Sequence, residues 1–376
     1  MNILIINPIL YTPLRRGGIV KQVDSIQNSL AITYAKGFRK LGHSVTVLSS
    51  AEYRPRLKED YNGVEIVYLP NIAKRIFNKF PNGFPILGGF KDFLKREGGK
   101  FDIVISSEAF TYTSFVAARV LPEKLIVWQE VGSHVKTMKG IPSKIWHNIA
   151  VRFLMRKALF VPRSPRAQKF ISQYAKRVSD EIVDHVVDRE CFAPCNDKSP
   201  YFVVISQLIK RKNIELTISK FAEFCNNYDK SYELHIVGRG EELDNLRNLA
   251  QKLGVADKVI FTGFKSRKEV AEILRHATAF MTDSTGEYNM VSMMESVSCG
   301  TPVITNTVPY SSDIVKDYEL GIVNNGWNYK DIINVIENIE KYSDNCIKYG
   351  EQLSYNYLVN KTIDTFRKYN ENTSDK

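Results

Sequence analysis

Short runs rich in Ile, Val and Leu alternate with longer segments of helical periodicity along the whole chain. Such alternation predicts parallel sheets built from right-handed strand–helix–strand units. In the first half, the expected strands are 2–7, 44–49, 64–69, 101–106 and 125–129. In the second half, they are 201–205, 233–237, 258–261, 279–282 and 302–305. The fold class is therefore expected to be α/β.

The helical patterns between these strands are long and amphipathic. In the first half, Val23, Ile26, Leu30 and Phe38 recur at helical spacing within 20–41, and Gly42 is expected to end this helix. In the second half, the expected helices are 213–227, 241–253 and 289–299.

The 376 residues are enough for two domains of this class. The best linker is 188–200, which has two prolines and many polar residues. We expect an N-terminal Rossmann-like domain over 1–190 and a C-terminal one over 191–352. Ligands of doubly wound sheets bind beyond the carboxyl ends of the strands, so the expected site is a cleft between the two domains.

Basic residues are concentrated in the first half of the chain. Up to Cys195 there are 30 Lys and Arg against 16 Asp and Glu, whereas the remainder has 22 against 25. The net charge of +11 therefore originates in the first half, which indicates an anionic partner such as phosphate groups, a membrane surface or nucleic acid. Nucleic acid is disfavoured because the chain has no recognised RNA or DNA module and its basic residues are scattered.

The sequence also indicates a cellular compartment. No window holds 18 uncharged apolar residues, and the N-terminus has no basic stretch before its apolar residues. A membrane-spanning helix and a signal peptide are therefore not expected. Five cysteines, of which only Cys191 and Cys195 lie close together, disfavour a disulfide framework and a zinc site. We expect a cytoplasmic protein.

Two segments interleave basic and aromatic side chains. Segment 74–100 has seven Lys and Arg, two acidic residues and five Phe, and segment 144–157 places four basic residues around Trp146, Ile149 and Phe153. This pattern is typical of an element that lies on anionic lipid. It is as typical of a helix that packs its apolar face on a sheet and exposes a basic face. The first interpretation implies a peripheral protein on the inner face of the membrane.

The segment 282–305 carries the clearest chemical signal. A strand leads into a polar turn, and a helix opens near Asn289. Glu287 lies just before this helix, where free N–H groups and the positive dipole end can bind an anion such as a diphosphate. Glu295 lies about two turns further on, and two carboxylates on one wall suit a hydroxyl-rich ligand. The simpler alternative is that Glu287 caps the helix and Glu295 faces solvent.

Glu287 and Glu295, followed by Cys-Gly-Thr-Pro-Val-Ile at 299–304, resemble the E-x7-E signature of retaining GT-B glycosyltransferases of the GT4 group. The resemblance continues, in chain order, through 16–19, 184–188, 206–213, 234–243 and 259–264. It implies a GT-B fold, with two Rossmann-like domains facing across a cleft. It also implies that the C-terminal helix, within 353–376, crosses back to complete the first domain.

The same resemblance implies an activity. A glycosyltransferase of this group moves a sugar from a nucleotide-diphosphate sugar to a glycan or a lipid-linked acceptor, with retention, in the synthesis of surface polysaccharides and glycoconjugates. It needs no metal and no cofactor other than the nucleotide sugar that serves as donor. The expected partners are therefore the donor, the acceptor and an anionic membrane surface.

The resemblance also assigns roles to the residues of the donor site. Glu295 would bind the ribose hydroxyls, and Glu287 would face a hydroxyl of the transferred sugar. Lys212 would neutralise the diphosphate. The backbone N–H groups of Tyr288, Asn289 and Met290 would lie near the sugar and the phosphates.

The expected donor site has two further parts. One is a loop that departs from the family pattern at Gln207, and the other is a glycine-rich loop in the first half of the chain. The family usually has an Arg where Gln207 stands, and Arg211 on the same loop has a bidentate fork that suits phosphate oxygens. Gly17 and Gly18 belong to the glycine-rich loop after the first strand. Glycine allows close backbone approach, so this loop can offer N–H groups to a phosphate, although an ordinary surface turn also explains the pair.

Acid–base chemistry has two candidates in the first half. The strand 125–129 is followed by Glu130, with His134 four residues on, where many relatives have a His-Asp pair. Either residue binds the donor sugar or receives the acceptor proton, or else Glu130 is a loop carboxylate and His134 is structural. His235 is expected in the core, and neither it nor His185 has an assigned role.

Two other functions share these features. A nucleotide-sugar epimerase has a related two-domain architecture, but it needs an acid–base pair around C2 of the sugar, which the sequence does not identify. A catalytically inactive relative that only binds glycans is the second alternative, because Gln207 replaces an expected cation.

Overall fold

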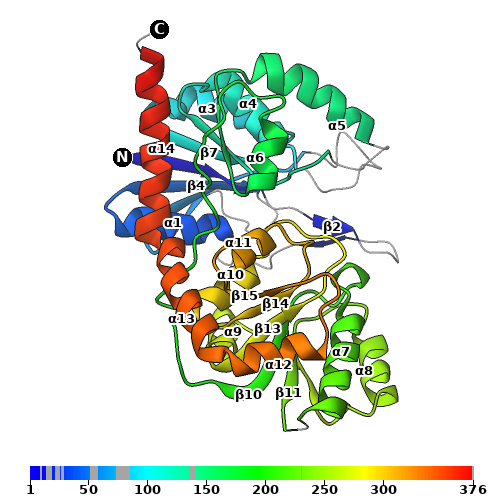
Figure 1. Cartoon of the computed structure of the whole chain (residues 1–376). Coiled ribbons are helices and arrows are strands. Elements are labelled where there is room, and N and C mark those ends of the chain that lie inside the picture. The colour runs from blue at the N-terminus through cyan, green and yellow to red at the C-terminus, as the bar shows by residue number, and fades with distance from the viewer. Residues whose placement is uncertain are drawn as a thin grey trace. The chain divides into compact units, whose positions relative to one another are not determined.

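The computed structural model describes residues 1–8, 11–13, 19–21, 26, 29–50, 58–72, 85–134, 140–229 and 231–374. The chain divides into two compact units. The first comprises Met1–Val186 and Tyr355–Lys376, and the second is Val187–Ser354. Each is an α/β unit around a largely parallel sheet, so the predicted fold class is confirmed (Figure 1).

Within the described residues, the sheet of the first unit has seven strands in the order β5-β6-β4-β1-β7-β8-β9. The strands are parallel except β5, which pairs antiparallel with β6 at the edge. Their bounds are β1 Asn2–Ile6, β4 Ser44–Ser50, β5 Lys58–Tyr61, β6 Val64–Leu69, β7 Ile103–Ser107, β8 Leu125–Gln129 and β9 Leu159–Pro162. The prediction missed β5, which is too charged to resemble a buried strand, and β9, which is only four residues long.

Helices cover both faces of this sheet. Alternate strand residues such as Ile3 and Ile5 form one core with α1 (Leu30–Lys40) and the C-terminal helix α14 (Tyr355–Ser374). Leu4 and Ile6 point to the opposite face and form a second core with α3 (Phe90–Glu97), α4 (Tyr112–Val120) and η5 (His147–Leu154). The two-residue period of the strands explains this division. The other helices that the structure describes in this unit are η3 Gly98–Lys100, α5 Ile141–Trp146 and α6 Pro165–Ile171.

The long helix predicted over 20–41 is wrong at its start. Ile19–Lys21 is strand β3, which pairs antiparallel with β2 (Tyr11–Pro13). Helix α1 begins only at Leu30, after Ser29. Ser29 has an extended backbone, and its hydroxyl accepts a hydrogen bond from the Ile32 N–H at 3.4 Å, which makes it the N-cap. The expected end is confirmed, because Gly42 has a φ of 82° just after the helix.

The second unit contains all five predicted strands, with ends shifted by two residues at most. Its six-stranded sheet, as described, is parallel and has the order β12-β11-β10-β13-β14-β15. The bounds are β10 Ser199–Ile205, β11 Glu233–Val237, β12 Val259–Gly263, β13 Ala277–Thr282, β14 Val303–Thr305 and β15 Gly321–Val323. Because β10 lies between β11 and β13, the loops that follow these three strands meet at one edge.

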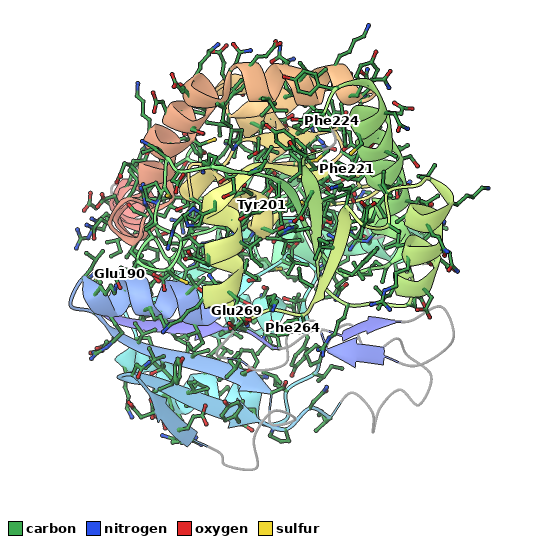
Figure 2. The ribbon with its side chains drawn as sticks, turned by 90° about the horizontal axis from the view of Figure 1, so that it is seen from below. Glu190, Tyr201, Phe221, Phe224, Phe264 and Glu269 are labelled. Atoms are coloured by element: carbon green, nitrogen blue, oxygen red, sulfur yellow. The ribbon has the colours of Figure 1, made fainter. Side chains whose placement is uncertain are left out.

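Helices also cover both faces of the second sheet. One core includes α7 (Ile214–Asn227), α8 (Leu243–Lys252) and α12 (Tyr329–Glu337), and Phe221 and Phe224 of α7 lie near each other in it, with ring centroids 6.4 Å apart (Figure 2). The other core includes α9 (Arg267–His276), α10 (Val291–Ser298), α11 (Ser312–Asp317) and α13 (Ile339–Gly350). The short turns η6 Lys210–Lys212 and η7 Glu351–Leu353 complete the unit.

No helix among the described residues combines the length and the apolar composition that crossing a membrane requires.

Candidate active site

The loops after β10 and β13 are joined by hydrogen bonds at the carboxyl edge of the second sheet. The Arg211 carbonyl accepts from the Thr285 N–H at 3.0 Å and from the Ser284 hydroxyl at 3.2 Å. The Asn213 amide donates to the Asp283 carbonyl at 3.1 Å. The parallel pairing of β10 with β13 places both loops at this edge, which brings the predicted residues of the two segments together.

Glu287 is ion-paired with both cations of the neighbouring loop. Its Oε2 contacts Lys212 Nζ directly and lies 3.0 Å from Arg211 Nη1. The side chains of Glu287 and Lys212 are only 13% and 12% exposed, whereas Arg211 is 46% exposed. Burial lowers the pKa of Lys212, and the Glu287 carboxylate opposes that effect. Glu287 is therefore no simple helix cap: α10 begins later, after Met290, and that N-cap has no side-chain hydrogen bond.

Two glycines allow the Lys212 loop to pack closely on the turn after β11. A Cβ atom on Gly238, whose φ is +144°, would lie 1.9 Å from the Ser206 carbonyl oxygen. One on Gly240 would lie 2.2 Å from the Leu208 carbonyl oxygen. The Leu208 N–H donates to the Arg239 carbonyl at 3.0 Å across the same contact. Only glycine fits at both positions, because the neighbouring atoms belong to backbone that cannot move aside easily.

Glu295 is buried in α10 and paired with a cation that the sequence did not indicate. Its Oε1 lies 3.0 Å from Nη1 of Arg267, the first residue of α9. Burial raises the pKa of Glu295, while the Arg267 guanidinium pulls it back down. The Arg267 guanidinium also lies 5.0 Å from the ring centroid of Phe192. The alternative in which Glu295 faces solvent does not hold, because the residue is 7% exposed.

The other residues predicted for the donor site lie on the same two loops, after β10 and after β13. Gln207 is exposed, so its side chain is at the surface of the loop where the family carries an Arg. Tyr288 is 41% exposed, and its ring centroid lies 5.6 Å from that of Tyr310. Asn289 and Met290 are buried, and the Met290 N–H donates to the Ser311 hydroxyl at 3.2 Å. The Met290 N–H, one of the groups expected near the phosphates, thus has a partner within the protein.

An aromatic residue at the same edge belongs to the segment 259–264 that resembles the family, but it has no role assigned from the sequence. Phe264 follows β12 directly and is 59% exposed, and Figure 2 shows it at the rim of the second unit. The guanidinium carbon of Arg239, from the turn after β11, lies 5.0 Å from its ring centroid. An exposed aromatic ring with a cation against it is a suitable stacking surface for a planar ligand group.

In the first unit, Glu130 lies in a network of charged groups at the carboxyl ends of β8 and β9. Its Oε2 is 3.5 Å from His185 Nε2, and His185 Nδ1 lies 2.9 Å from an Nη of Arg163. The Arg163 guanidinium lies 4.5 Å from the Trp128 ring centroid. Glu130 is 29% exposed at its side chain and His185 only 3%. His185, which the sequence left without a role, is therefore a direct neighbour of the acid–base candidate.

His134 belongs to a different cluster of the same unit. Its two ring nitrogens lie 3.2 Å from the Ser143 hydroxyl and 3.1 Å from the Tyr174 hydroxyl. The rings of His147 and Phe170 pack edge-on against it, with centroids 5.2 and 5.1 Å away. Burial lowers the pKa of His134, so the neutral ring is favoured. These contacts describe a packed histidine and separate the partners of His134 from those of Glu130.

Glu108 is a further acid that the sequence analysis missed. It follows β7 with a φ of 67°, a left-handed conformation that is uncommon for a residue with a side chain. Its carboxylate accepts hydrogen bonds from the Glu130 N–H at 2.9 Å and from the Gln129 side-chain amide at 3.0 Å. Burial, together with the nearby Glu130 carboxylate, raises its pKa to about 8. An acidic residue with a left-handed backbone directly after a strand is a signal that only the structure reveals.

The predicted glycine-rich loop, with Gly17 and Gly18, lies outside the described residues. The second unit nevertheless has a clear candidate site for a diphosphate. The largely buried Lys212 ammonium and the partly exposed Arg211 guanidinium converge at the carboxyl edge of its sheet, where they can hold this group.

Comparisons with known proteins agree with this geometry. The family model of glycosyl transferases group 1 matches residues 192–353. The chain is 34% identical to the alpha-monoglucosyldiacylglycerol synthase of Streptococcus pneumoniae over 117 residues, which cover 31% of this chain and 26% of that protein. It is 26% identical to the gpi3 subunit of the phosphatidylinositol N-acetylglucosaminyltransferase of Schizosaccharomyces pombe over 288 residues, 71% of this chain and 60% of that protein. The chain thus spans less than two-thirds of either relative.

The fold of the whole chain is also shared. The structure of Anabaena HepE in complex with UDP matches with a TM-score of 0.67 at 14% identity, covering 98% of this chain and all of that one. At this identity the similarity concerns the fold alone; it is the GT-B fold, as the family resemblance implied.

Proposed function

We propose that the protein, whose residues 192–353 match the family model of glycosyl transferases group 1 and whose chain has the GT-B fold, is a retaining, metal-independent glycosyltransferase. It moves a sugar from a nucleoside-diphosphate sugar to a glycan or lipid-linked acceptor in the synthesis of surface glycans. The observation that carries the proposal is the contact of Glu287 with Lys212 and Arg211 at the carboxyl edge of the second sheet.

In this proposal the donor's diphosphate replaces Glu287 as the partner of the two cations. Lys212 is largely buried, so a charge-assisted contact to phosphate is stronger there than in water. Arg211 lies on the same loop and reaches the same carboxylate, which supports its use in place of the Arg missing at Gln207. Release from its ion pairs then leaves the Glu287 carboxylate available for a hydroxyl of the donor sugar.

The chemistry follows from where charge develops. The bond between the anomeric carbon and the β-phosphate oxygen breaks, and that oxygen gains negative charge, which Lys212 and Arg211 stabilise. The acceptor hydroxyl oxygen forms the new bond to the anomeric carbon from the same face, so the configuration is retained. Its proton passes to the departing phosphate, and a nucleoside diphosphate leaves.

Glu295 completes the donor site in this proposal. Its buried carboxylate takes the ribose hydroxyls, and the Arg267 guanidinium favours its charged form against the effect of burial. The exposed ring of Phe264 offers a stacking surface for the base at the same edge. The fold is shared with a protein that was crystallised with UDP, which supports a nucleotide as part of the ligand.

The first unit would serve the acceptor. Two relatives are named for lipids, diacylglycerol and phosphatidylinositol, which supports a lipid-linked acceptor and a peripheral position at the membrane. Glu130 is the better candidate for contact with a reacting hydroxyl, because its carboxylate is partly exposed, whereas both nitrogens of His134 lie against protein hydroxyls.

The proposal is tested by incubating the protein with a panel of uridine, guanosine and adenosine diphosphate sugars, with lipid and glycan acceptors, and measuring released nucleoside diphosphate and glycosylated product. Glu287→Gln should lower turnover by about two orders of magnitude or more, and Glu337→Gln, which removes the same charge from an exposed site on α12, should leave it intact. The anomeric configuration of the product, determined by NMR, tests retention.

Two other outcomes would replace the proposal. An interconverted nucleotide sugar without transfer would identify an epimerase. Glycan binding with no chemistry on any donor would identify an inactive relative.

A further inference from the structure

The continuous helix formed by α5 and η5 carries a line of exposed apolar side chains, called here the outer stripe. Ile141, Ile145 and Ile149 are each 56% exposed, and Phe153 is 60% exposed. Large apolar side chains that gather on one exposed helix face mark an interaction site more often than scattered ones do.

The outer stripe does not hold the helix on its unit, because other side chains do so. Val151 and Met155 are fully buried in the core beside the sheet. Trp146 packs on Phe115, with ring centroids 5.2 Å apart, and its indole N–H donates to the Ala109 carbonyl at 2.9 Å. Figure 1 shows α5 at the side of the first unit away from α14. The helix thus has two apolar sides: one packs against the core of the first unit, and the other, the outer stripe, is exposed.

The π-helical geometry of η5 keeps the outer stripe aligned. An α-helix has 3.6 residues per turn, so side chains that are four residues apart drift around the helix axis, each time in the same direction. From His147 to Leu154 the helix is a π-helix, in which the Met155 N–H donates to the Ala150 carbonyl at 2.9 Å. Its wider turn reverses the drift. Ile141, Ile149 and Phe153 therefore stay closer to a single line than in a regular α-helix.

The surroundings of the outer stripe are basic. The segment 131–179 contains 11 Lys and Arg and no Asp or Glu. Lys144, Arg152 and Arg156 are exposed on the helix or directly after it, and Arg152 donates to the Gln173 carbonyl at 2.8 Å. Lys157 is paired with Glu123 at 2.9 Å, so its charge is partly compensated.

We propose that the outer stripe lies in the head-group region of an anionic bilayer, with Ile145, Ile149 and Phe153 reaching the acyl boundary and Lys144 and Arg156 among the lipid phosphates. An apolar line flanked by exposed cations matches an anionic lipid surface in both respects. It suits a second copy of the chain poorly, because a two-fold contact through this face would bring like charges together. The inference stands on these observations and needs no glycosyltransferase activity.

The test is sedimentation of the full chain with vesicles of phosphatidylcholine alone or with one-third phosphatidylglycerol, at low and high salt, without donor or acceptor. We expect pelleting only with the anionic vesicles, weakened by salt. The pair Ile145→Glu and Ile149→Glu should lower the partition coefficient more than about tenfold, because two apolar side chains no longer enter the bilayer. The pair Lys144→Glu and Arg156→Glu should lower it by roughly 25-fold or more, from about fivefold for each charge near an anionic surface.

Matched variants in the second unit separate this effect from general changes. Leu216→Glu alters a 39% exposed apolar residue of α7, and the pair Lys252→Glu and Lys330→Glu changes the net charge as the basic pair does. Both should pellet as the unchanged protein does, and circular dichroism should show that all variants are folded. Equal loss in the control variants, or full pelleting of the Ile145→Glu and Ile149→Glu protein, would overturn the proposal. The proposal would also be overturned by a second result. In that case gel filtration shows a dimer that the Ile145→Glu and Ile149→Glu substitutions disrupt, and the vesicles bind neither the unchanged protein nor this variant.

Discussion

Lys220 of α7 and Asp283, the residue that follows β13, form an ion pair in the interior of the second unit, at the root of the loop that carries Glu287. Lys220 is 8% exposed and Asp283 is 3% exposed. The Lys220 Nζ also lies 4.0 Å from the Trp327 ring centroid, and the other carboxylate oxygen of Asp283 accepts from the Asn306 amide at 2.7 Å. A fully partnered charge therefore fixes the start of the loop.

Replacing one member of this pair should destabilise the protein strongly. Lys220→Met leaves the Asp283 carboxylate buried without its cation, and such changes cost about 3–5 kcal/mol. The double variant with Asp283→Asn should recover much of that loss, because no uncompensated charge remains. Urea unfolding of both single variants and the double variant measures the coupling. A Lys220→Met protein as stable as the exposed-site control Lys252→Met would contradict this account.

Glu287→Gln should separate nucleotide binding from turnover. In the structure the Glu287 carboxylate contacts both Lys212 and Arg211, so it competes with a diphosphate for them. The neutral amide competes less, and we expect the Kd for the nucleoside diphosphate to stay equal or fall, while kcat falls by two orders of magnitude or more, as for loss of a group that acts in the transition state. Calorimetry and product assays measure the two effects.

Lys212→Ala is the counterpart of that variant. It removes the buried cation and should weaken diphosphate binding by about 2–4 kcal/mol. Glu295→Ala should abolish donor binding. Unchanged affinity in both of these variants would refute the assignment of the donor site to this edge.

Gly240→Ala should disturb the loop that carries Lys212. The added Cβ would lie 2.2 Å from the Leu208 carbonyl oxygen, so backbone must shift, at a cost of about 1–3 kcal/mol. We expect lower thermal stability and weaker diphosphate binding together. Gly326→Ala is the control, because a Cβ there meets nothing within 4 Å. If the two variants melt and bind alike, the close packing is not what the loop requires.

Glu108 should make stability depend on pH in the neutral range. Its pKa is raised to about 8, whereas an unfolded Glu has a pKa of about 4.3. The folded state therefore holds a proton that the unfolded state has lost, and stability falls as the pH rises between these values, by at most about 1.4 kcal/mol per pH unit.

Glu108→Gln should remove this slope, so the variant gains stability relative to the unchanged protein from about pH 5 to 8. Urea unfolding at several pH values measures the difference. Glu123→Gln, at an exposed site of the same unit, should leave the slope unchanged. Parallel pH profiles of the unchanged protein and Glu108→Gln would show that Glu108 is ionised throughout.

The accuracy of the sequence-based prediction followed the strength of the local pattern. Strand β11 was predicted without error, because its apolar residues Leu234, Ile236 and Val237 are buried in a parallel sheet and the run has no competing interpretation. The start of α1 was misplaced because Val23 and Ile26 continue the helical period beyond Ser29. The true start of α1 is marked by the Ser29 hydroxyl that caps the helix and by the three-residue strand β3 before it. Both are weaker local signals than the helical periodicity.

For the site, the sequence placed Glu287, Glu295 and Lys212 in the right loops and helix but assigned them no protein partners. Arg267, Lys220 and Glu108 lie far along the chain from the acids they contact, and no pattern links them to those acids. For the two cations the reason is the burial of the acids that they contact, because an uncompensated buried charge is costly and requires a partner. For Glu108, burial instead favours the protonated side chain.

The order of residues alone determined the alternation of strands and helices, the excess of positive charge in the first half, and the pair of acids spaced eight apart, because these are properties of neighbours along the chain. The tertiary structure alone decided which side of the helix over 141–154 remains uncovered. It also decided which cation faces which carboxylate, because distant strands paired and brought their loops to one edge. Contacts between segments that are tens of residues apart depend on that pairing, which cannot be inferred from the local periodicity of the sequence.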